Sequence, residues 1–211
     1  MVEFALAMPF FLAAGLGGIE TANFSISSMR VAQMAIHIAD NASRVGDTST
    51  LENRKVYESD INDVFVGAHL QGGRLDFFDH GRAVVSSLEV LDPDGDGDGP
   101  QYIHWQRCMG KKAFVSAYGG EGTGNDGSLP GMGPAGEEVI ALPGDAVIFV
   151  EVSYDYQPLV SEMFTFRDEV TSVASFNVRD KRDLSGLFQR DDANPDPVAD
   201  CDIYESVSVA G

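Results

Sequence analysis

The sequence is poor in basic residues, and this shortage limits its partners. Fourteen lysines and arginines stand against 33 aspartates and glutamates, which leaves a net charge of −19. A chain with this balance repels phosphate backbones and anionic lipid headgroups, so we expect no nucleic acid among its partners. Its negative surface instead attracts cations, and divalent cations most strongly.

Recognisable catalytic motifs are also missing. No nucleophile elbow, Walker loop or paired-cysteine motif occurs, and the four histidines form no close metal pair. Residues 122–127 (GTGNDG) match the letters of a dinucleotide-binding fingerprint, but they lie in a glycine-rich stretch that runs into Pro130 rather than opening a helix. We therefore expect a protein that is not an enzyme.

Cysteine is scarce as well. Only Cys108 and Cys201 occur, and neither has the close cysteine or histidine neighbours that a zinc site needs. They are either two buried thiols or one long-range disulfide, and the export indicated by the N-terminal segment favours the disulfide. Such a bridge stabilises a fold by about 4–5 kcal/mol in the chain-entropy model.

The N-terminal segment is the most distinctive part of the chain. Residues 4–19 (FALAMPFFLAAGLGGI) carry no charge and are bracketed by Glu3 and Glu20. This run is shorter than the roughly twenty residues that comfortably span a bilayer. A signal peptide would carry a basic stretch before the run and a small-x-small cleavage site after it, and neither is present.

The helical pattern continues beyond Glu20 and becomes amphipathic. The periodicity predicts one helix from the N-terminus to about Val45, ending near Gly46, so that residues 1–46 form a stalk. Its lower half is expected to pack on a globular head of residues 47–211. The apolar positions predicted to face the head are Ile19, Ala22, Ile26, Met29, Met34, Ile38, Ala42 and Val45.

Glu3 is unusual because a carboxylate beside an apolar membrane segment costs several kcal/mol unless it gains a partner. A free α-amino group of a neighbouring chain is one such partner. The alternative is that Glu3 lies at the level of the lipid headgroups, which a terminal position permits.

Residues 2–12 (VEFALAMPFFL) and the closing Gly18-Ile19-Glu20 resemble the N-terminus of TadE-like proteins, the pseudopilins of tight-adherence pili in the type IV pilus superfamily. The shared features are Glu-Phe-Ala-Leu, a proline six residues after the glutamate, and the apolar run. The resemblance covers about the first twenty residues, although residues 105–108 and 178–184 are also similar to longer members. Mature type IV pilins usually carry the glutamate fifth, whereas here it is third.

The resemblance implies a structural subunit, a pilin or pseudopilin. Such a subunit is held in the inner membrane by its N-terminal helix, processed by a prepilin peptidase, and added by an ATP-driven platform to an extracellular filament at the cell surface. Its partners are copies of itself or other pilins. The alternative function is a membrane-anchored module for surface adhesion or ligand binding. The residues expected to carry assembly are Glu3, Phe4, Leu6, Pro9, Phe10, Phe11, Leu12, Leu16 and Ile19.

The remaining residues predict a small α+β head with a mainly antiparallel sheet. A second helix is expected over 57–71, with Ile61, Val64, Phe65 and Leu70 on its apolar side. Strands are expected at 83–91, 102–107, 146–156 and 170–178, the first two as a hairpin. The glycine-rich segment 119–144 and the acidic tail 189–201 are expected to lack regular structure.

The acidic loop 92–99 (DPDGDGDG) is a candidate calcium site. It places Asp92, Asp94, Asp96 and Asp98 at every second position, and alternating carboxylates with glycine at the bend can surround a hard cation. The loop is not an EF-hand, because Ile103 stands where the bidentate glutamate is needed. The alternative is a hydrated hairpin turn in an acidic protein.

Overall fold

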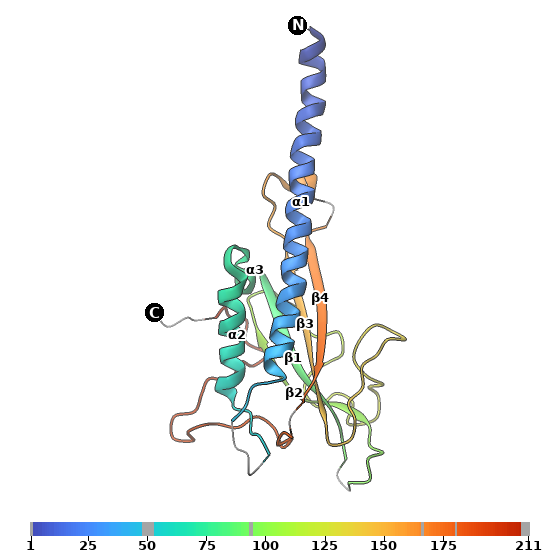
Figure 1. The fold of residues 1–211 in the computed structure, drawn as a ribbon, viewed down its shortest axis with the longest axis vertical. Helices are drawn as coiled ribbons and strands as arrows, with labels where there is room; N and C mark the ends of the chain where they lie inside the picture. The colour runs from blue at the N-terminus through green and yellow to red at the C-terminus, as the bar shows by residue number, and fades with distance from the viewer. Residues whose placement is uncertain (1, 48–52, 93–94, 166, 180, 208–211) are drawn as a thin grey trace.

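The computed structural model describes residues 2–47, 53–92, 95–165, 167–179 and 181–207, and this part of the chain has an α+β fold (Figure 1). The first element is a 41-residue helix, α1 (Val2–Ala42). The elements that follow are α2 (Glu58–Gly72), η1 (Gly73–Leu75), α3 (Phe77–His80), β1 (Gly81–Val90), β2 (Gln101–Met109), β3 (Ala146–Asp155), η2 (Glu162–Phe164) and β4 (Glu169–Asn177). The predicted α+β class is confirmed.

The four strands form one antiparallel sheet in the order β2-β1-β3-β4. As predicted, β1 and β2 form a hairpin around the acidic loop, and β4 pairs with β3 across the turn near Pro158. The register shifts between Ser87 and Leu88, where a bulge interrupts the β1–β2 ladder. The strand predictions were correct to within a few residues because each strand carries a run of β-branched and aromatic side chains.

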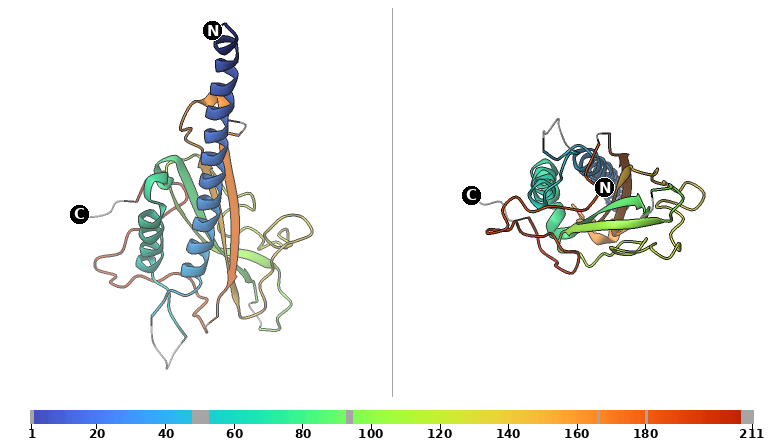
Figure 2. Two further views of the ribbon diagram at one scale, coloured as in Figure 1. Left: turned by 45° about the horizontal axis from the view of Figure 1, so that its top comes forward. Right: turned by 90° about the horizontal axis from the view of Figure 1, so that it is seen from below.

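The main core lies between the sheet and the helices. Figure 2 shows α1 and α2 together on one side of the sheet, and α1 contacts β3, β4 and α2. From α1, Val31, Ala35 and Ile38 are completely buried, and Phe65 of α2 is equally buried. Alanines on the packed face of α1 let the helix axis approach its neighbours closely.

The glycine-rich segment covers the opposite face of the sheet. It has only isolated bridges, as predicted, but Leu129, Met132 and Ala141 pack there in a second apolar cluster against β1, β2 and β3. The carboxylate of Glu151 on β3 is buried under this segment. It accepts hydrogen bonds from Ser116 Oγ and from the backbone N–H of Ala117 at 2.9 Å. A segment without regular structure therefore serves as a layer of the fold.

Two details of the helices differ from expectation. Helix α1 ends at Ala42 rather than near Val45, and Arg182 donates hydrogen bonds to the carbonyl oxygens of Val45 (2.9 Å) and Ala42 (3.3 Å). A side chain from the end of the sheet thus satisfies the last carbonyls of the helix. In α2, Leu70 was predicted to lie on the apolar side of the helix, but it is exposed.

The two ends of the molecule differ in kind. The first half of α1 extends beyond every other element, whereas the second half lies along the sheet (Figure 1). The β1–β2 hairpin connection lies at the opposite end of the molecule from the N-terminus (Figure 1). The stalk and the acidic loop are therefore at opposite ends of the long axis.

Candidate assembly surface

The protruding half of α1 exposes its apolar side chains in all directions. None of the described side chains between Glu3 and Ile19 is buried, and Phe4, Phe10 and Phe11 are 69%, 78% and 73% exposed. The nine residues predicted to carry assembly are all exposed. Monomeric soluble proteins rarely expose contiguous apolar surface on this scale, so a surface of this kind marks a site of interaction.

Among the residues that the structure describes, no helix combines the length and the apolarity needed to cross a membrane.

A second exposed apolar surface runs along the head half of α1. It consists of the residues Ile19, Ala22, Ile26, Met29 and Ile36, which we call the outer stripe. The prediction that Ile19, Ala22, Ile26 and Met29 face the head was wrong. At 100° per residue these positions lie on the side of the helix opposite Val31, Ala35 and Ile38, which do face the head.

The outer stripe joins the stalk to form one continuous surface. Ile26 and Met29 are 46% and 55% exposed, although they lie beside the folded head. Positions 12, 15, 19, 22, 26, 29 and 36 follow spacings of three, four and seven residues, which is the spacing of a helix that packs along another helix. Helix α1 therefore has one apolar face for its own sheet and a second that nothing in the described chain covers.

Glu20 marks the point where the stalk enters the head. Its side chain is 1% exposed and accepts hydrogen bonds from Tyr156 Oη (2.5 Å) and from the backbone N–H groups of Val160 (2.7 Å) and Leu159 (3.2 Å). Burial raises the pKa of the Glu20 carboxyl, whereas the hydrogen bonds to the carboxylate lower it. The hydrogen bonds together outweigh burial, so the pKa of Glu20 lies below the ordinary value. Glu20 thereby fastens the β3–β4 connection to α1.

Tyr156 completes this junction. Its hydroxyl also accepts a hydrogen bond from Asn23 Nδ2 at 2.6 Å, and its ring packs edge-on against Phe24 with centroids 5.1 Å apart. Burial and the nearby Glu20 carboxylate raise the pKa of Tyr156 to about 12, which keeps the hydroxyl protonated as a donor to Glu20. The junction thus fixes the direction in which the stalk leaves the head.

Cys108 and Cys201 form a disulfide with their Cα atoms 4.7 Å apart, so the prediction of a long-range bridge is confirmed. The backbone N–H of Cys108 also donates to the Ala199 carbonyl at 2.8 Å. The bridge holds the acidic tail beside the last residues of β2.

Arg82 adds a second attachment for the tail. Its side chain is completely buried and donates hydrogen bonds to the carbonyl oxygens of Cys201 (2.6 Å), Ile203 (3.0 Å) and Gly110 (2.8 Å). Its guanidinium group also lies 4.0 Å from the ring centroid of Tyr204. Nothing in the sequence pattern indicated this role, because an arginine in a strand is ordinarily at the surface.

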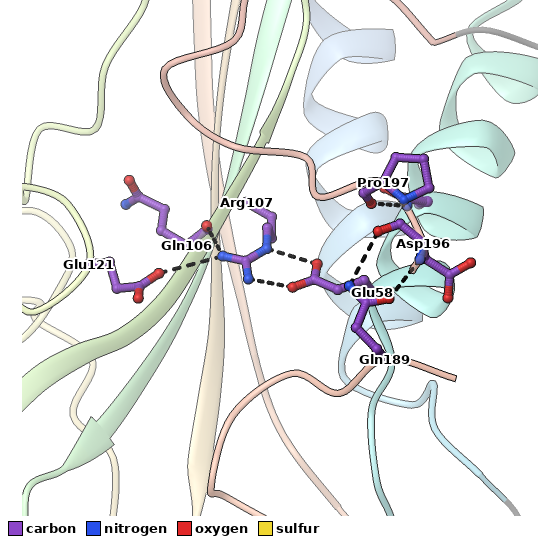
Figure 3. A network of polar contacts seen from close by, with 8 residues as sticks. Glu58, Gln106, Arg107, Glu121, Gln189, Asp196 and Pro197 are labelled. Carbon is purple, nitrogen blue, oxygen red and sulfur yellow. Dashed lines mark hydrogen bonds and ion pairs between the residues drawn. The ribbon is translucent and has the colours of Figure 1, made fainter. Parts of the chain in front are cut away.

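A network of polar contacts joins α2, β2 and the tail (Figure 3). Arg107 binds both carboxylate oxygens of the buried Glu58, at 2.8 Å and 2.5 Å, and also contacts Glu121 at 3.4 Å. Gln189 accepts a hydrogen bond from the Asp196 backbone N–H at 2.6 Å. The bidentate pair of Arg107 and Glu58 orients α2 against the hairpin. The pair could not be predicted, because the two residues are far apart in the sequence.

The four aspartates of the acidic loop are not placed as a metal site in the described residues. The Asp92 carboxylate accepts hydrogen bonds from the backbone N–H groups of Gly95 (2.8 Å) and Gly97 (3.1 Å), and Asp96 accepts one from the Asp98 N–H (3.3 Å). Asp94 lies outside the described residues, among which no group of three potential metal ligands occurs. Calcium binding at this loop stays a prediction.

Ser87, Glu89 and His104 are the residues whose arrangement most resembles a catalytic group. Ser87 Oγ donates to Glu89 Oε1 at 2.6 Å, and His104 Nδ1 lies 2.9 Å from Glu89 Oε2. In a nucleophilic triad the histidine lies between the serine and the carboxylate, whereas here the carboxylate lies between them. The Glu89 hydrogen bond raises the pKa of His104, and this arrangement does not activate Ser87.

Comparisons of the chain with protein-family models, with curated proteins and with solved structures find no match.

Proposed function

We propose that this protein is a structural subunit, a pilin or pseudopilin, of an extracellular filament of the type IV pilus kind. In this proposal the α1 helices of neighbouring copies bundle in the filament core and the acidic heads form the outer shell. The partners are copies of this chain or other pilins.

The observation that carries the proposal is the continuity of exposed apolar surface on α1. The stalk alone is also compatible with a simple anchor. The outer stripe favours bundling, because Ile26 and Met29 lie beside the head, where an anchor that enters lipid only at its tip has no use for apolar side chains. A head that covers α1 on one side only leaves the other side available to neighbouring helices.

The resemblance of residues 2–12 to TadE-like proteins adds the route of assembly to the proposal. It includes a prepilin peptidase, an inner-membrane platform and a period in the membrane before assembly. The membrane stage stays a prediction, since no described helix meets the requirements of a membrane span.

Substitution in the stalk tests the proposal. Leu12→Asp places a charge without a partner among packed helices, which costs several kcal/mol, and is expected to abolish filaments in electron micrographs of the purified protein. Val115→Asp is the matched control, because Val115 is 71% exposed on the head and its change should leave assembly intact.

The same pair of variants distinguishes the alternative function. A surface adhesion or ligand-binding module would not form filaments, and Leu12→Asp would alter only its attachment. Normal filaments from Leu12→Asp would contradict the proposal directly.

A further inference from the structure

Helix α1 carries two charged side chains that the head does not use. Glu20 is held by the β3–β4 connection, and Asp40 pairs with Arg44 at 2.5 Å. Glu3 and Arg30 are both exposed, and neither makes a hydrogen bond or ion pair within the described part of the chain. The helix therefore presents one anion at its tip and one cation beside the head.

These two charges lie on opposite sides of the helix. Glu3 and Arg30 are 27 positions apart in the sequence, which corresponds to about seven and a half turns and about 40 Å of α-helix. Because 27 residues make seven whole turns and one further half turn, the two side chains lie about 180° apart around the helix axis. One copy can thus offer its anion to a neighbour on one side and its cation to a neighbour on the other.

Arg30 also borders an open cavity that no part of the described chain fills. The cavity has a volume of about 620 Å³ and lies between α1 and the end of α2. Its lining residues are Arg30, Gln33, Met34, His37, Gln71, Gly72 and Gly73. Of these lining residues, Arg30 carries a positive charge and Met34 contributes an apolar side chain. The cavity therefore suits the tip of an apolar helix that carries one carboxylate.

We propose that the N-terminal tip of one copy occupies this cavity on a second copy, with the Glu3 carboxylate paired to the Arg30 guanidinium. The inference rests on the proposed function and specifies the register of the bundle. The two α1 helices run parallel and are displaced by about 40 Å along their axes. This displacement also brings the apolar residues after Glu3 to the level of residues 31–42 of the second copy, a span that includes Ile36 of the outer stripe.

The opposite placement of the charges decides between an open and a closed assembly. In a two-fold antiparallel dimer the same face of each helix forms the contact, so Glu3 and Arg30 would need to lie on one side. Their placement on opposite sides instead requires a head-to-tail contact, in which every copy uses both charges and the interface repeats without closing. Such a contact generates a filament, and it leaves no Glu3 carboxylate unpaired among apolar helices.

Charge exchange tests the pairing in the full chain. We expect Glu3→Arg and Arg30→Glu each to reduce the yield of filaments roughly tenfold or more, and the double variant to restore it. Arg179→Glu changes an exposed cation that is not part of α1, and it is the matched control. It should assemble normally on its own and should not rescue Glu3→Arg.

Cross-linking gives a second readout that does not depend on yield. With Glu3→Cys and Arg30→Cys in one chain, oxidation of filaments should produce a ladder of covalent multimers, because the native cysteines are already paired. Filaments that withstand Arg30→Glu and give no ladder would overturn the pairing while leaving the proposed function intact. A double charge variant that stays unassembled, or a cross-linked product that stops at dimers, would also overturn it. Absence of filaments from the unaltered protein would overturn the proposed function itself.

Discussion

The two halves of α1 use the same kind of side chain for different purposes. In the head half, Val31, Ala35 and Ile38 are buried against the sheet and hold the domain together. In the stalk half, Phe4, Phe10 and Phe11 are mostly exposed and belong to neither apolar cluster of the head. An apolar residue in this helix is thus either a core residue or an exposed one. In the stalk half every side of the helix is exposed, whereas in the head half the side of the helix decides.

The largest expected effect on the head alone comes from its disulfide. Replacing Cys108 and Cys201 with alanine should lower the free energy of unfolding by about 2–5 kcal/mol, because the bridge and Arg82 together hold the tail. Chemical denaturation measures this loss. The stalk is remote from the bridge, so the folded double variant should still form filaments at low temperature. Failure to form them would show that the stalk and the head do not act independently.

The two faces of α1 can be compared directly with a pair of isoleucines. Ile38 is completely buried and Ile26 is 46% exposed. Ile38→Ala should destabilise the head by about 2–4 kcal/mol, whereas Ile26→Ala should change its stability by less than about 0.5 kcal/mol.

Assembly should show the reverse order for the same pair. Ile26→Ala removes part of the outer stripe and should weaken filaments more than Ile38→Ala does at a temperature where both heads are folded. Equal effects of the two changes on stability would mean that the outer stripe belongs to the core.

Glu20 connects the two regions and should make their junction sensitive to pH. Its folded-state pKa lies below the ordinary value of 4.5, so its contribution is present above about pH 4.5 and is lost as the pH falls through the folded-state pKa. At neutral pH, Glu20→Gln should lower the melting temperature by about 3–6 °C, and the difference should shrink in acid.

Glu162→Gln is the control for this experiment, because Glu162 lies in the same connection and is exposed. A constant difference between wild type and Glu20→Gln from pH 7 to pH 3 would show that the carboxylate charge has no role at the junction.

Calcium should have a modest effect, at the end of the head opposite the stalk. Without a bidentate glutamate the acidic loop should bind calcium with a dissociation constant on the order of 10⁻⁴–10⁻³ M. Binding then adds about 1–3 kcal/mol at calcium concentrations several-fold to a hundredfold above that constant. Melting with chelator and with millimolar calcium measures this gain, which an Asp94→Ala, Asp96→Ala double variant should lose. Asp191→Ala, Asp192→Ala changes the same charge in the tail and should keep it. Equal gains in both variants would identify the loop as a solvated turn.

The sequence predicted the features that depend on local pattern. The strands follow from apolar and β-branched runs, and the stalk follows from an uncharged segment. The buried face of α1 was assigned wrongly because residues 19–29 carry apolar side chains on two sides, and a pattern alone does not say which side meets the head. Small residues such as Ala35 and Ala39 pack best there but contribute little to hydrophobic periodicity.

The polar contacts of the head were beyond prediction for a different reason. Glu20 and Val160, or Glu58 and Arg107, are distant in sequence and are brought together only by the completed fold. A glutamate at the edge of an apolar helix predicts exposure, whereas the β3–β4 connection buries Glu20 by supplying three donors. The disulfide could be predicted, because the chain has only two cysteines.

A reconstruction of the purified filament at a resolution that separates helices tests the central claim most directly. We predict parallel α1 helices at the axis, with most of the surface of residues 4–19 and the outer stripe buried between copies, and the acidic heads outside. A filament in which that surface faces solvent, or purified protein that remains monomeric with it exposed, would contradict the account.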